Sequence, residues 1–315
     1  MKKPKLYFEN LTVTEAQKSI LEKKYDLTTD YSSGDIGVFL DPLKLPVKFP
    51  GFKILYLVEP EAVRPDLYSK SNLSKFDQVI TVSTDRAKRI NSEFVIPLSI
   101  SGQYFPQYKK FKVKRNRLAA IINEHKFSAS GRSMYGFRRE LLVQSEKRNI
   151  PIDIYGGQWV DGKFLEFQRR IFAIRKQISA RKPVNIYEAM SHIFHNYSRT
   201  MGRATDTSEL LCYQYSIVIE NDPDFVSEKL WKSFYAGAVP IYVGPFHLLD
   251  FKMKEAVIYC PPIIEKVIEL LTTPNRTLTL RKRKIGYDLT KDASVIEKSE
   301  RKWVLDLQAN LEKYY

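Results

Sequence analysis

The stretch SIVIENDPDFVSEKLWKSFYAGAVPIYVGP, residues 216–245, places two apolar runs on either side of a polar loop and a helix-like segment. The first run is short and continuously apolar, as expected of a strand that is buried on both faces. In 230–235 the large apolar side chains are spaced as on one helix face, and VPIYVG at 239–244 is a second buried strand. This order predicts two parallel strands joined by a crossover helix.

The same alternation recurs along the chain, which predicts an α/β protein with parallel sheets. Strand-like runs stand at 5–9, 37–41, 53–59, 78–83, 117–123, 152–156, 215–220, 239–244 and 256–260. A polar, aromatic and basic stretch at 101–114 interrupts them. We therefore predict two Rossmann-like domains, 1–110 and 111–315, with a cleft lined by the carboxyl ends of strands. The last segment, 299–315, has helical spacing and could pack back across either domain.

Composition adds a charge signal and a prediction of location. The 315 residues carry a net charge of +15, which favours polyanionic partners such as nucleic acid, anionic lipid or phosphorylated small molecules. No window approaches the roughly 20 apolar residues of a membrane span. The two cysteines, Cys212 and Cys260, lack metal-site spacing and suit a reducing cytoplasm. We expect a soluble cytoplasmic protein.

Residues 164–178 predict a basic amphipathic helix. Its apolar side chains recur at intervals of three and four, with arginines and a lysine between them; they are Phe164, Phe167, Ile171, Ile174 and Ile178. Two arrangements are open. In the commoner one the apolar face packs against the core and the basic face meets solvent. In the other the helix lies on an anionic membrane.

The polar loop of the opening stretch carries the chemistry. It follows the carboxyl end of a strand, where open sheets bind ligands. Asp222 or Asp224 could cap the next helix, whose positive dipole end favours anions. The Glu228 carboxylate suits paired hydrogen bonds from ribose hydroxyls, and the Lys229 ammonium suits a diphosphate. Together they predict a nucleotide-sugar site, although a solvated Glu-Lys pair on a helix is the alternative.

In order and nearly in spacing, Ile219-Glu220-Asn221 and Phe225-Val226-Ser227-Glu228-Lys229 resemble the signature of the α-1,3-fucosyltransferases of glycosyltransferase family 10. The resemblance implies a GT-B fold, with GDP-fucose on the C-terminal domain and the acceptor facing the N-terminal one. It implies that Glu228 binds the ribose, Lys229 the diphosphate, and that Asn221 shapes the loop. Phe225 departs from the usual Tyr and so lacks a hydroxyl, and Asp222 stands where Ser is common.

Two further segments resemble the same family. In GRSMYGFRRELL an arginine on a helix is expected to contact phosphate, and we choose Arg138, with Arg132 and Arg139 as alternatives. Tyr155 and Gly156 match the family's strand end and are expected to shape a loop. These residues complete the donor-side set.

In LVEPEAVRPDLY the resemblance implies a catalytic carboxylate at a strand end. Two registrations are open, and they select either Glu59 or Glu61. Glu59 directly ends the strand, so we prefer it slightly.

The implied reaction is an inverting transfer of fucose from GDP-β-L-fucose to a hydroxyl of a glycan, such as O3 of GlcNAc or Glc in a bacterial lipopolysaccharide O-antigen. Another GDP-sugar on the same scaffold is the alternative. Asp222-Pro223-Asp224 is formally a DxD metal motif, but a Glu-Lys turn follows it, so we expect neither metal nor cofactor. Binding of nucleic acid is not expected, because the aromatic residues lie in apolar patterns. The implied location is the cytoplasm, with peripheral contact at the inner face of the membrane.

Overall fold

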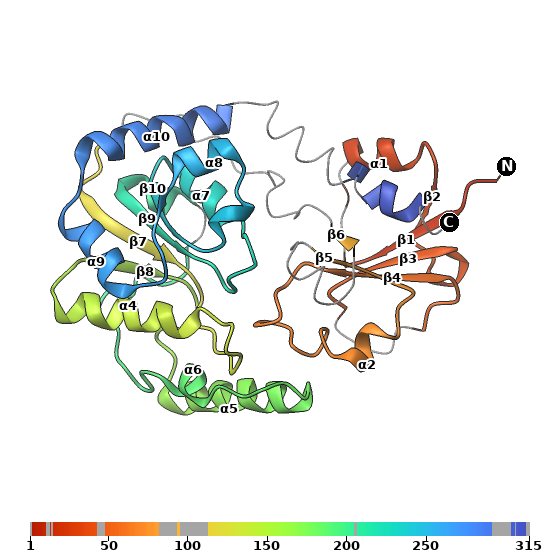
Figure 1. Ribbon diagram of the computed structural model, residues 1–315, viewed down its shortest axis with the longest axis horizontal. Helices are drawn as coiled ribbons and strands as arrows, with labels where there is room; N and C mark the ends of the chain where they lie inside the picture. The colour runs from red at the N-terminus through yellow and green to blue at the C-terminus, as the bar shows by residue number, and fades with distance from the viewer. Residues whose placement is uncertain are drawn as a thin grey trace. The chain divides into compact units, whose positions relative to one another are not determined.

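The computed structural model describes residues 2–10, 13, 15–42, 48–81, 93–94, 113–204, 207–291, 304–305 and 307–312. The chain divides into two compact units. The first consists of Met1–Ser101 together with Ile296–Tyr315, and the second of Gly102–Val295. Each unit contains one parallel sheet flanked by helices, so the predicted α/β class is confirmed (Figure 1).

The first unit is built on a parallel sheet with the strand order β2-β1-β3-β4-β5-β6. The strands are β1 (Lys5–Glu9), β2 (Asp26–Thr28), β3 (Ile36–Leu40), β4 (Phe52–Leu57), β5 (Gln78–Thr81) and β6 (Glu93–Phe94). The helices are α1 (Glu15–Leu21) and α2 (Lys70–Leu73), with a 3-10 turn at Tyr31–Ser33. Because Leu40 pairs with Tyr56, the residues that follow β3 and β4 leave the sheet at the same edge.

Aromatic packing stabilises one face of this sheet. Phe39 of β3 contacts Phe49 edge-on, with ring centroids 5.5 Å apart, and Tyr7 of β1 stacks on Phe49 at 6.0 Å. The predicted boundary at residue 110 lies outside the described residues. The end of the chain, which was predicted within 111–315 and expected to pack on either domain, belongs with the first unit, where Glu312 forms an ion pair with Lys24.

The second unit has the strand order β11-β10-β9-β7-β8, again parallel throughout. Its strands are β7 (Arg117–Ile122), β8 (Ile152–Tyr155), β9 (Tyr213–Ile219), β10 (Val239–Val243) and β11 (Ile258–Tyr259). The helices are α4 (Tyr135–Lys147), α5 (Lys163–Ser179), α6 (Ile186–Met190), α7 (Lys229–Ala236), α8 (Phe251–Ala256), α9 (Ile264–Thr272) and α10 (Arg276–Lys291). Two 3-10 turns lie at Thr207–Cys212 and Phe246–Leu248.

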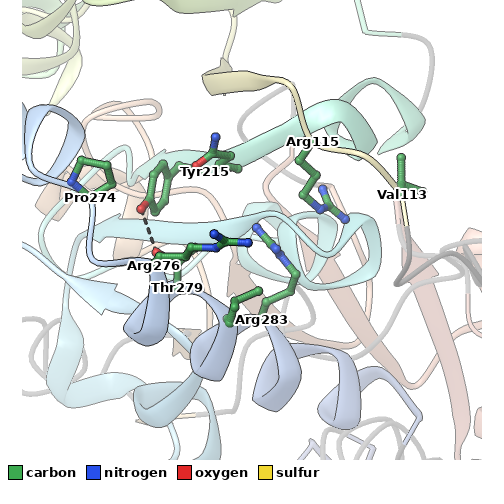
Figure 2. A pocket seen from close by; sticks show the side chains of 9 residues that line it. Val113, Arg115, Tyr215, Pro274, Arg276, Thr279 and Arg283 are labelled. Atoms are coloured by element: carbon green, nitrogen blue, oxygen red, sulfur yellow. Dashed lines mark hydrogen bonds between the residues drawn. The ribbon is translucent and has the colours of Figure 1, made fainter.

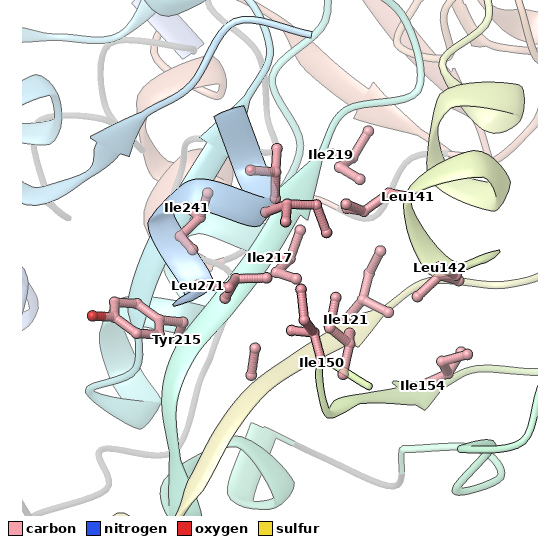
Figure 3. Close-up of a cluster of buried hydrophobic side chains, with 14 of the residues drawn as sticks. Ile121, Leu141, Leu142, Ile150, Ile154, Tyr215, Ile217, Ile219, Ile241 and Leu271 are labelled. Carbon is pink, nitrogen blue, oxygen red and sulfur yellow. The ribbon is translucent and has the colours of Figure 1, made fainter. Parts of the chain in front are cut away.

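Helices cover both faces of this sheet, which explains why its strands read as continuous apolar runs. Helices α4 and α9 pack on one face, whereas α7, α8 and α10 cover the other (Figure 1). On the α4 and α9 side, Ile121, Ile217 and Ile241 of three neighbouring strands meet Leu141 and Leu271 in one buried cluster (Figure 3). This core holds the carboxyl ends of β9 and β10 in register, with Ile219 beside Val243.

Each of the nine predicted strand segments contains a strand, and β2 and β6 were missed because they are too short to leave an apolar run. The predicted helix at 164–178 is α5, but the commoner of its two expected arrangements, with the apolar face inward, is wrong: Glu166, Arg170 and Gln177 are buried, and Phe164 and Phe172 are exposed. Within the described residues, none of the helices is both long enough and apolar enough to traverse a bilayer.

Candidate functional site

The loop 220–228 joins the carboxyl end of β9 to α7. Helix α7 begins at Lys229, with Glu228 at its N-cap position, so the expected caps at Asp222 and Asp224 are wrong. Asp222 instead accepts a hydrogen bond from the Asp224 backbone N–H at 3.1 Å and closes a turn inside the loop. The Glu220 backbone N–H donates to the Val243 carbonyl at 3.0 Å, which ties the start of the loop to β10.

Glu220 and Lys229 form the buried centre of this loop. Glu220 is fully buried and accepts from the Ser227 backbone N–H at 3.0 Å, while its other carboxylate oxygen lies 3.8 Å from Lys229 Nζ. Lys229 Nζ also donates to Ser227 Oγ at 2.9 Å. Burial raises the pKa of Glu220 and lowers the pKa of Lys229. The charge of Lys229 limits the rise for Glu220, and the charge of Glu220 limits the fall for Lys229.

Glu228 lies at the exposed rim of the loop. Its side chain is 43% exposed and pairs with Lys232 at 3.2 Å, one turn further along α7. Burial would raise the pKa of Glu228, but Lys229 and Lys232 outweigh it and hold that pKa below its usual value. An ionised, accessible carboxylate therefore stands directly beside the buried ammonium of Lys229.

Arg132 binds both aspartates of the loop. Its Nη2 lies 3.3 Å from Asp222 Oδ1 and also forms an ion pair with Asp224. Asp222 is fully buried, whereas the Arg132 side chain is 33% exposed. Both carboxylates of the DxD-like sequence thus contact one arginine from the segment before α4.

Arg138 and Arg139 are neighbours on α4 but have different partners. Arg138 Nη2 donates to the Ile219 carbonyl at 3.0 Å and lies 3.3 Å from Asn221 Oδ1. Arg138 therefore holds the start of the candidate loop. Burial lowers its pKa to about 10. Arg139 donates instead to the Glu188 carbonyl and, at 2.9 Å, to Ser191 Oγ, away from the loop. Of the predicted arginines, Arg132 and Arg138 border the loop and Arg139 does not.

Tyr155 is not brought to this loop. Its hydroxyl lies 3.1 Å from the hydroxyl of Tyr213, which begins β9, at the opposite end of that strand from Glu220. Gly156 has a φ of 144°, and a Cβ there would lie 2.0 Å from the Asn123 carbonyl oxygen. Only glycine fits this turn.

Tyr242 and His125 were not predicted as site residues. The buried Tyr242 hydroxyl has no hydrogen-bond partner among the described residues, and the charge of Glu220 helps to raise the Tyr242 pKa beyond the effect of burial. His125 follows β7 and stacks on Trp159 with ring centroids 4.4 Å apart; burial lowers its pKa to about 3, so it is neutral. The alternation of strands and helices did not predict the surroundings of these two side chains. Tyr242 nevertheless lies in a predicted strand, and His125 follows one.

In the first unit, Glu59 follows β4 and donates its backbone N–H to Asp41 Oδ2 at 2.7 Å. Its carbonyl accepts from the Tyr68 hydroxyl at 2.9 Å. Glu61 lies two residues further on, in a turn. Asp41, which follows β3, was missed as a site residue; burial, chiefly, and then the charge of Glu59 raise its pKa to about 7. The rule that selected Glu59, a carboxylate at the carboxyl end of a strand, also selects Asp41.

A cavity of about 440 Å³ in the second unit is lined by three arginines, Arg115, Arg276 and Arg283 (Figure 2). Two of them have structural partners at the end of α7. Arg115 donates to the Ala236 carbonyl at 2.6 Å and Arg283 to the Gly237 carbonyl at 3.0 Å. They stabilise the carbonyl end of that helix, where cations are favoured.

Neither a protein-family model nor a curated protein sequence matches the chain. Its structure is similar to the Anabaena protein Alr3699/HepE solved with UDP and glucose, with a TM-score of 0.50 and 9% identity over 94% of this chain and 98% of that one. It is equally similar to a trehalose-6-phosphate synthase, at a TM-score of 0.50 and 11% identity over 91% of this chain and 75% of the other. The chain has the GT-B fold. An α1,3-fucosyltransferase solved with GDP has a TM-score of 0.47 and 11% identity, covering 95% of this chain and 90% of that one.

The loop 220–228 follows β9 and lies at the carboxyl edge of the parallel sheet of the second unit. In such sheets the ligand-binding residues stand on the loops after the strands. Among the described residues, no three His, Cys, Asp or Glu side chains gather as metal ligands. The loop offers the half-exposed carboxylate of Glu228 and, next to it in sequence, the ammonium of Lys229.

Proposed function

We propose that the protein is an inverting glycosyltransferase that moves L-fucose from GDP-β-L-fucose to a hydroxyl of a glycan. The single observation that carries this proposal is the position of Glu228 and Lys229, next to each other at the start of α7, after β9 of a GT-B fold. A carboxylate suited to ribose hydroxyls stands next to an amine suited to a diphosphate. The resemblance of 219–229 to the family 10 signature supports fucose as the sugar.

The donor side follows from the charges of the loop. Glu228 is accessible and ionised, so it can accept hydrogen bonds from both ribose hydroxyls. Lys229, at the first position of α7, offers its ammonium and the positive end of the helix dipole to the diphosphate. Arg138 holds the loop through Ile219 and Asn221, so we assign it a positioning role.

The chemical step is a single displacement. The acceptor oxygen attacks the anomeric carbon, the bond from that carbon to the β-phosphate oxygen breaks, and GDP leaves with the electron pair. A carboxylate takes the proton of the acceptor hydroxyl, and we propose Glu59 or Glu61 for this role. General-base assistance of this kind contributes about 10² to 10⁴ in rate.

The leaving diphosphate requires fixed positive charge rather than a metal in this proposal. Asp222 and Asp224 would be the metal ligands of a DxD motif, but Arg132 already contacts both carboxylates. Lys229 then supplies charge to the phosphates directly. Activity that persists in EDTA is the expected result, and its loss with recovery on adding Mn²⁺ or Mg²⁺ would contradict this part.

The proposed acceptor is a bacterial surface glycan such as a lipopolysaccharide O-antigen, fucosylated at O3 of GlcNAc or Glc on the cytoplasmic side. It rests on the resemblance alone. The alternative is another GDP-sugar on the same scaffold, because Glu228 and Lys229 would contact the nucleotide rather than the sugar. A UDP-sugar belongs in the test as well, since the similar Anabaena protein was solved with UDP.

A thermal-shift panel tests the proposal, with GDP, GDP-fucose, GDP-mannose, UDP-glucose, UDP-galactose and CMP-sialic acid. A ligand at 100 times its dissociation constant stabilises a protein by about 2.7 kcal/mol, which is readily detected. Stabilisation by GDP and most strongly by GDP-fucose is expected. Stabilisation by UDP-sugars alone would overturn the guanosine assignment, and equal stabilisation by GDP-mannose would favour the alternative donor. Product analysis with an N-acetyllactosamine acceptor then tests the transfer itself.

A further inference from the structure

Helix α5 is inverted relative to an ordinary surface helix. Its buried side chains are polar or small, namely Glu166, Arg170, Ala173 and Gln177. Arg170 is fully buried, and its guanidinium lies 4.3 Å from the centre of the Phe127 ring. The larger apolar residues of the helix are therefore exposed, whereas Ile171 and Ile174 are half-buried.

Hydrogen bonds hold α5 in this orientation. Arg170 Nε donates to Glu166 Oε1 at 2.9 Å, and its Nη1 donates to the carbonyls of Ala189 at 2.6 Å and Ser191 at 3.1 Å. Gln177 Nε2 donates to the Pro183 carbonyl at 3.0 Å. Rotating the helix to bury its apolar face would break these bonds and strand a buried charge, which is costly. The outward apolar face is thus a fixed feature of the fold.

Exposed apolar side chains also stand on the segments next to α5. Helices α5 and α6 lie together at the outer edge of the second unit, beyond α4 (Figure 1). Phe164 is 74% exposed and Phe172 66%, which for phenylalanine is unusual in a protein surface. We call the following residues the α5 surface: Val160, Phe164, Leu165, Phe167, Phe172, Ile178, Ile186 and Tyr187, all of them exposed.

The stretch of sequence that forms this surface is also rich in basic residues. Between 160 and 187 the two acidic residues, Asp161 and Glu166, are each paired with an arginine, Arg169 and Arg170 respectively. Five further basic residues belong to the same stretch: Lys163, Arg175, Lys176, Arg181 and Lys182. Arg175 is exposed on the same side of the helix as Phe164. The partner of the α5 surface must therefore accept apolar side chains and positive charge together.

We propose that the α5 surface docks the protein on an anionic lipid bilayer. A helix that lies in the membrane interface inserts its apolar side chains among the acyl chains and directs lysines and arginines to the anionic headgroups. A second copy of the chain fits less well, because a symmetric contact through this surface would bring two positively charged surfaces together. The proposal does not rest on the sugar chemistry of the loop 220–228.

Co-sedimentation of the full chain with lipid vesicles tests the proposal. Vesicles of phosphatidylglycerol and phosphatidylcholine should bind the protein, pure phosphatidylcholine should bind it much less, and rising salt should weaken binding. The double variant Phe164→Ser/Phe172→Ser should lower the partition coefficient at least about tenfold. Phe251→Ser is the matched control, since Phe251 is 75% exposed on α8 of the same unit.

A charge variant separates the two parts of the interaction. Lys163→Glu/Arg175→Glu should weaken binding to anionic vesicles and leave the weak binding to neutral ones unchanged. All these residues are exposed, and circular dichroism should report an unaltered fold. Equal binding of wild type and the phenylalanine double variant would overturn the proposal. So would a wild-type dimer, measured by light scattering, that the double variant converts to a monomer, because the surface would then join two copies.

Discussion

Lys229 Nζ and Glu220 Oε2 lie 3.8 Å apart in the interior of the loop that follows β9, and Glu220 is fully buried. The ammonium is bonded to Ser227 Oγ, and the carboxylate accepts from the Ser227 backbone N–H. A buried pair of this kind persists because each charge offsets the desolvation of the other. A diphosphate that reached Lys229 would share its ammonium with Glu220, so this pair has no net charge before the ligand arrives.

Lys229→Met should weaken GDP binding about 10- to 150-fold, because one charge-assisted contact contributes roughly 1.5 to 3 kcal/mol. Isothermal titration calorimetry measures the dissociation constant. Lys266→Met is the control: Lys266 is exposed on α9 and pairs with Glu269 at 2.9 Å. An unchanged dissociation constant for Lys229→Met would remove Lys229 from the donor site.

Substitutions of Lys229 and Glu220 should have non-additive effects on the free energy of unfolding. Lys229→Met alone leaves the Glu220 carboxylate buried without a counter-charge, at a cost of about 3 to 5 kcal/mol. Adding Glu220→Gln removes that charge, so the double variant should recover most of the lost free energy of unfolding while GDP binding stays weak. Chemical denaturation of the two single variants and the double variant completes the cycle. Strict additivity of the two single changes would show that the side chains do not interact.

Glu59→Gln and Glu61→Gln should separate the two candidate bases. The variant that removes the base should lose about 10²- to 10⁴-fold in kcat with little change in donor affinity, and the other should stay within a few-fold of wild type. Initial rates of product formation from GDP-fucose measure kcat, and calorimetry with GDP measures donor binding. If neither change lowered kcat by tenfold, the base would lie elsewhere in the chain.

The sequence predicted the sheets because burial on both faces leaves an apolar run that needs no tertiary information. It predicted the position of Lys229 at the start of α7, but it could not distinguish an aspartate that caps a helix from one that binds a distant arginine. Asp222 and Arg132 are 90 residues apart in sequence, and only the fold brings them to 3.3 Å. A local pattern therefore predicted where the loop lies but not which of its side chains pair with distant residues.

The orientation of helix α5 is a second feature that could not be predicted from the sequence. Its periodicity correctly predicted a helix with one apolar face, but periodicity does not tell which face meets the core. Here the buried Glu166–Arg170 pair and the carbonyls of Ala189 and Ser191 at the end of α6 decide the orientation. Asp41 differs from these cases, because its place at the end of the predicted strand 37–41 can be read directly from the sequence.

Gly244→Ala should disturb the donor loop from β10. A Cβ at Gly244 would lie 2.7 Å from Glu220 Cγ and 2.7 Å from the Tyr242 hydroxyl. Both side chains are buried, so the methyl group should displace Glu220 and cost about 1 to 3 kcal/mol of stability. GDP affinity should fall several-fold as well. Gly162→Ala is the control, since nothing lies within 4 Å of a Cβ there. Equal stability and affinity in both variants would show that Glu220 is free to move.

Asp41→Asn should change how stability depends on pH. Burial, with the charge of Glu59, raises the pKa of Asp41 to about 7 despite the neighbouring Arg64. An unfolded aspartate ionises near pH 4, so between about pH 4 and 7 the folded chain keeps a proton that the unfolded chain has released. This contribution to stability is fully present below pH 4 and is lost as pH rises through 7.

The Asn variant has no such proton, so its free energy of unfolding relative to wild type should increase from pH 5 to pH 8. We expect an increase of about 1 to 2 kcal/mol, less than the full pKa shift would give, because Asp41 is only partly buried. Denaturant unfolding at the two pH values measures it. Asp77→Asn, which removes an exposed carboxylate beside β5, controls for the loss of one charge. If Asp41→Asn and wild type lost stability in parallel, Asp41 would titrate like an ordinary aspartate, and Glu59 would have no protonated neighbour near neutral pH.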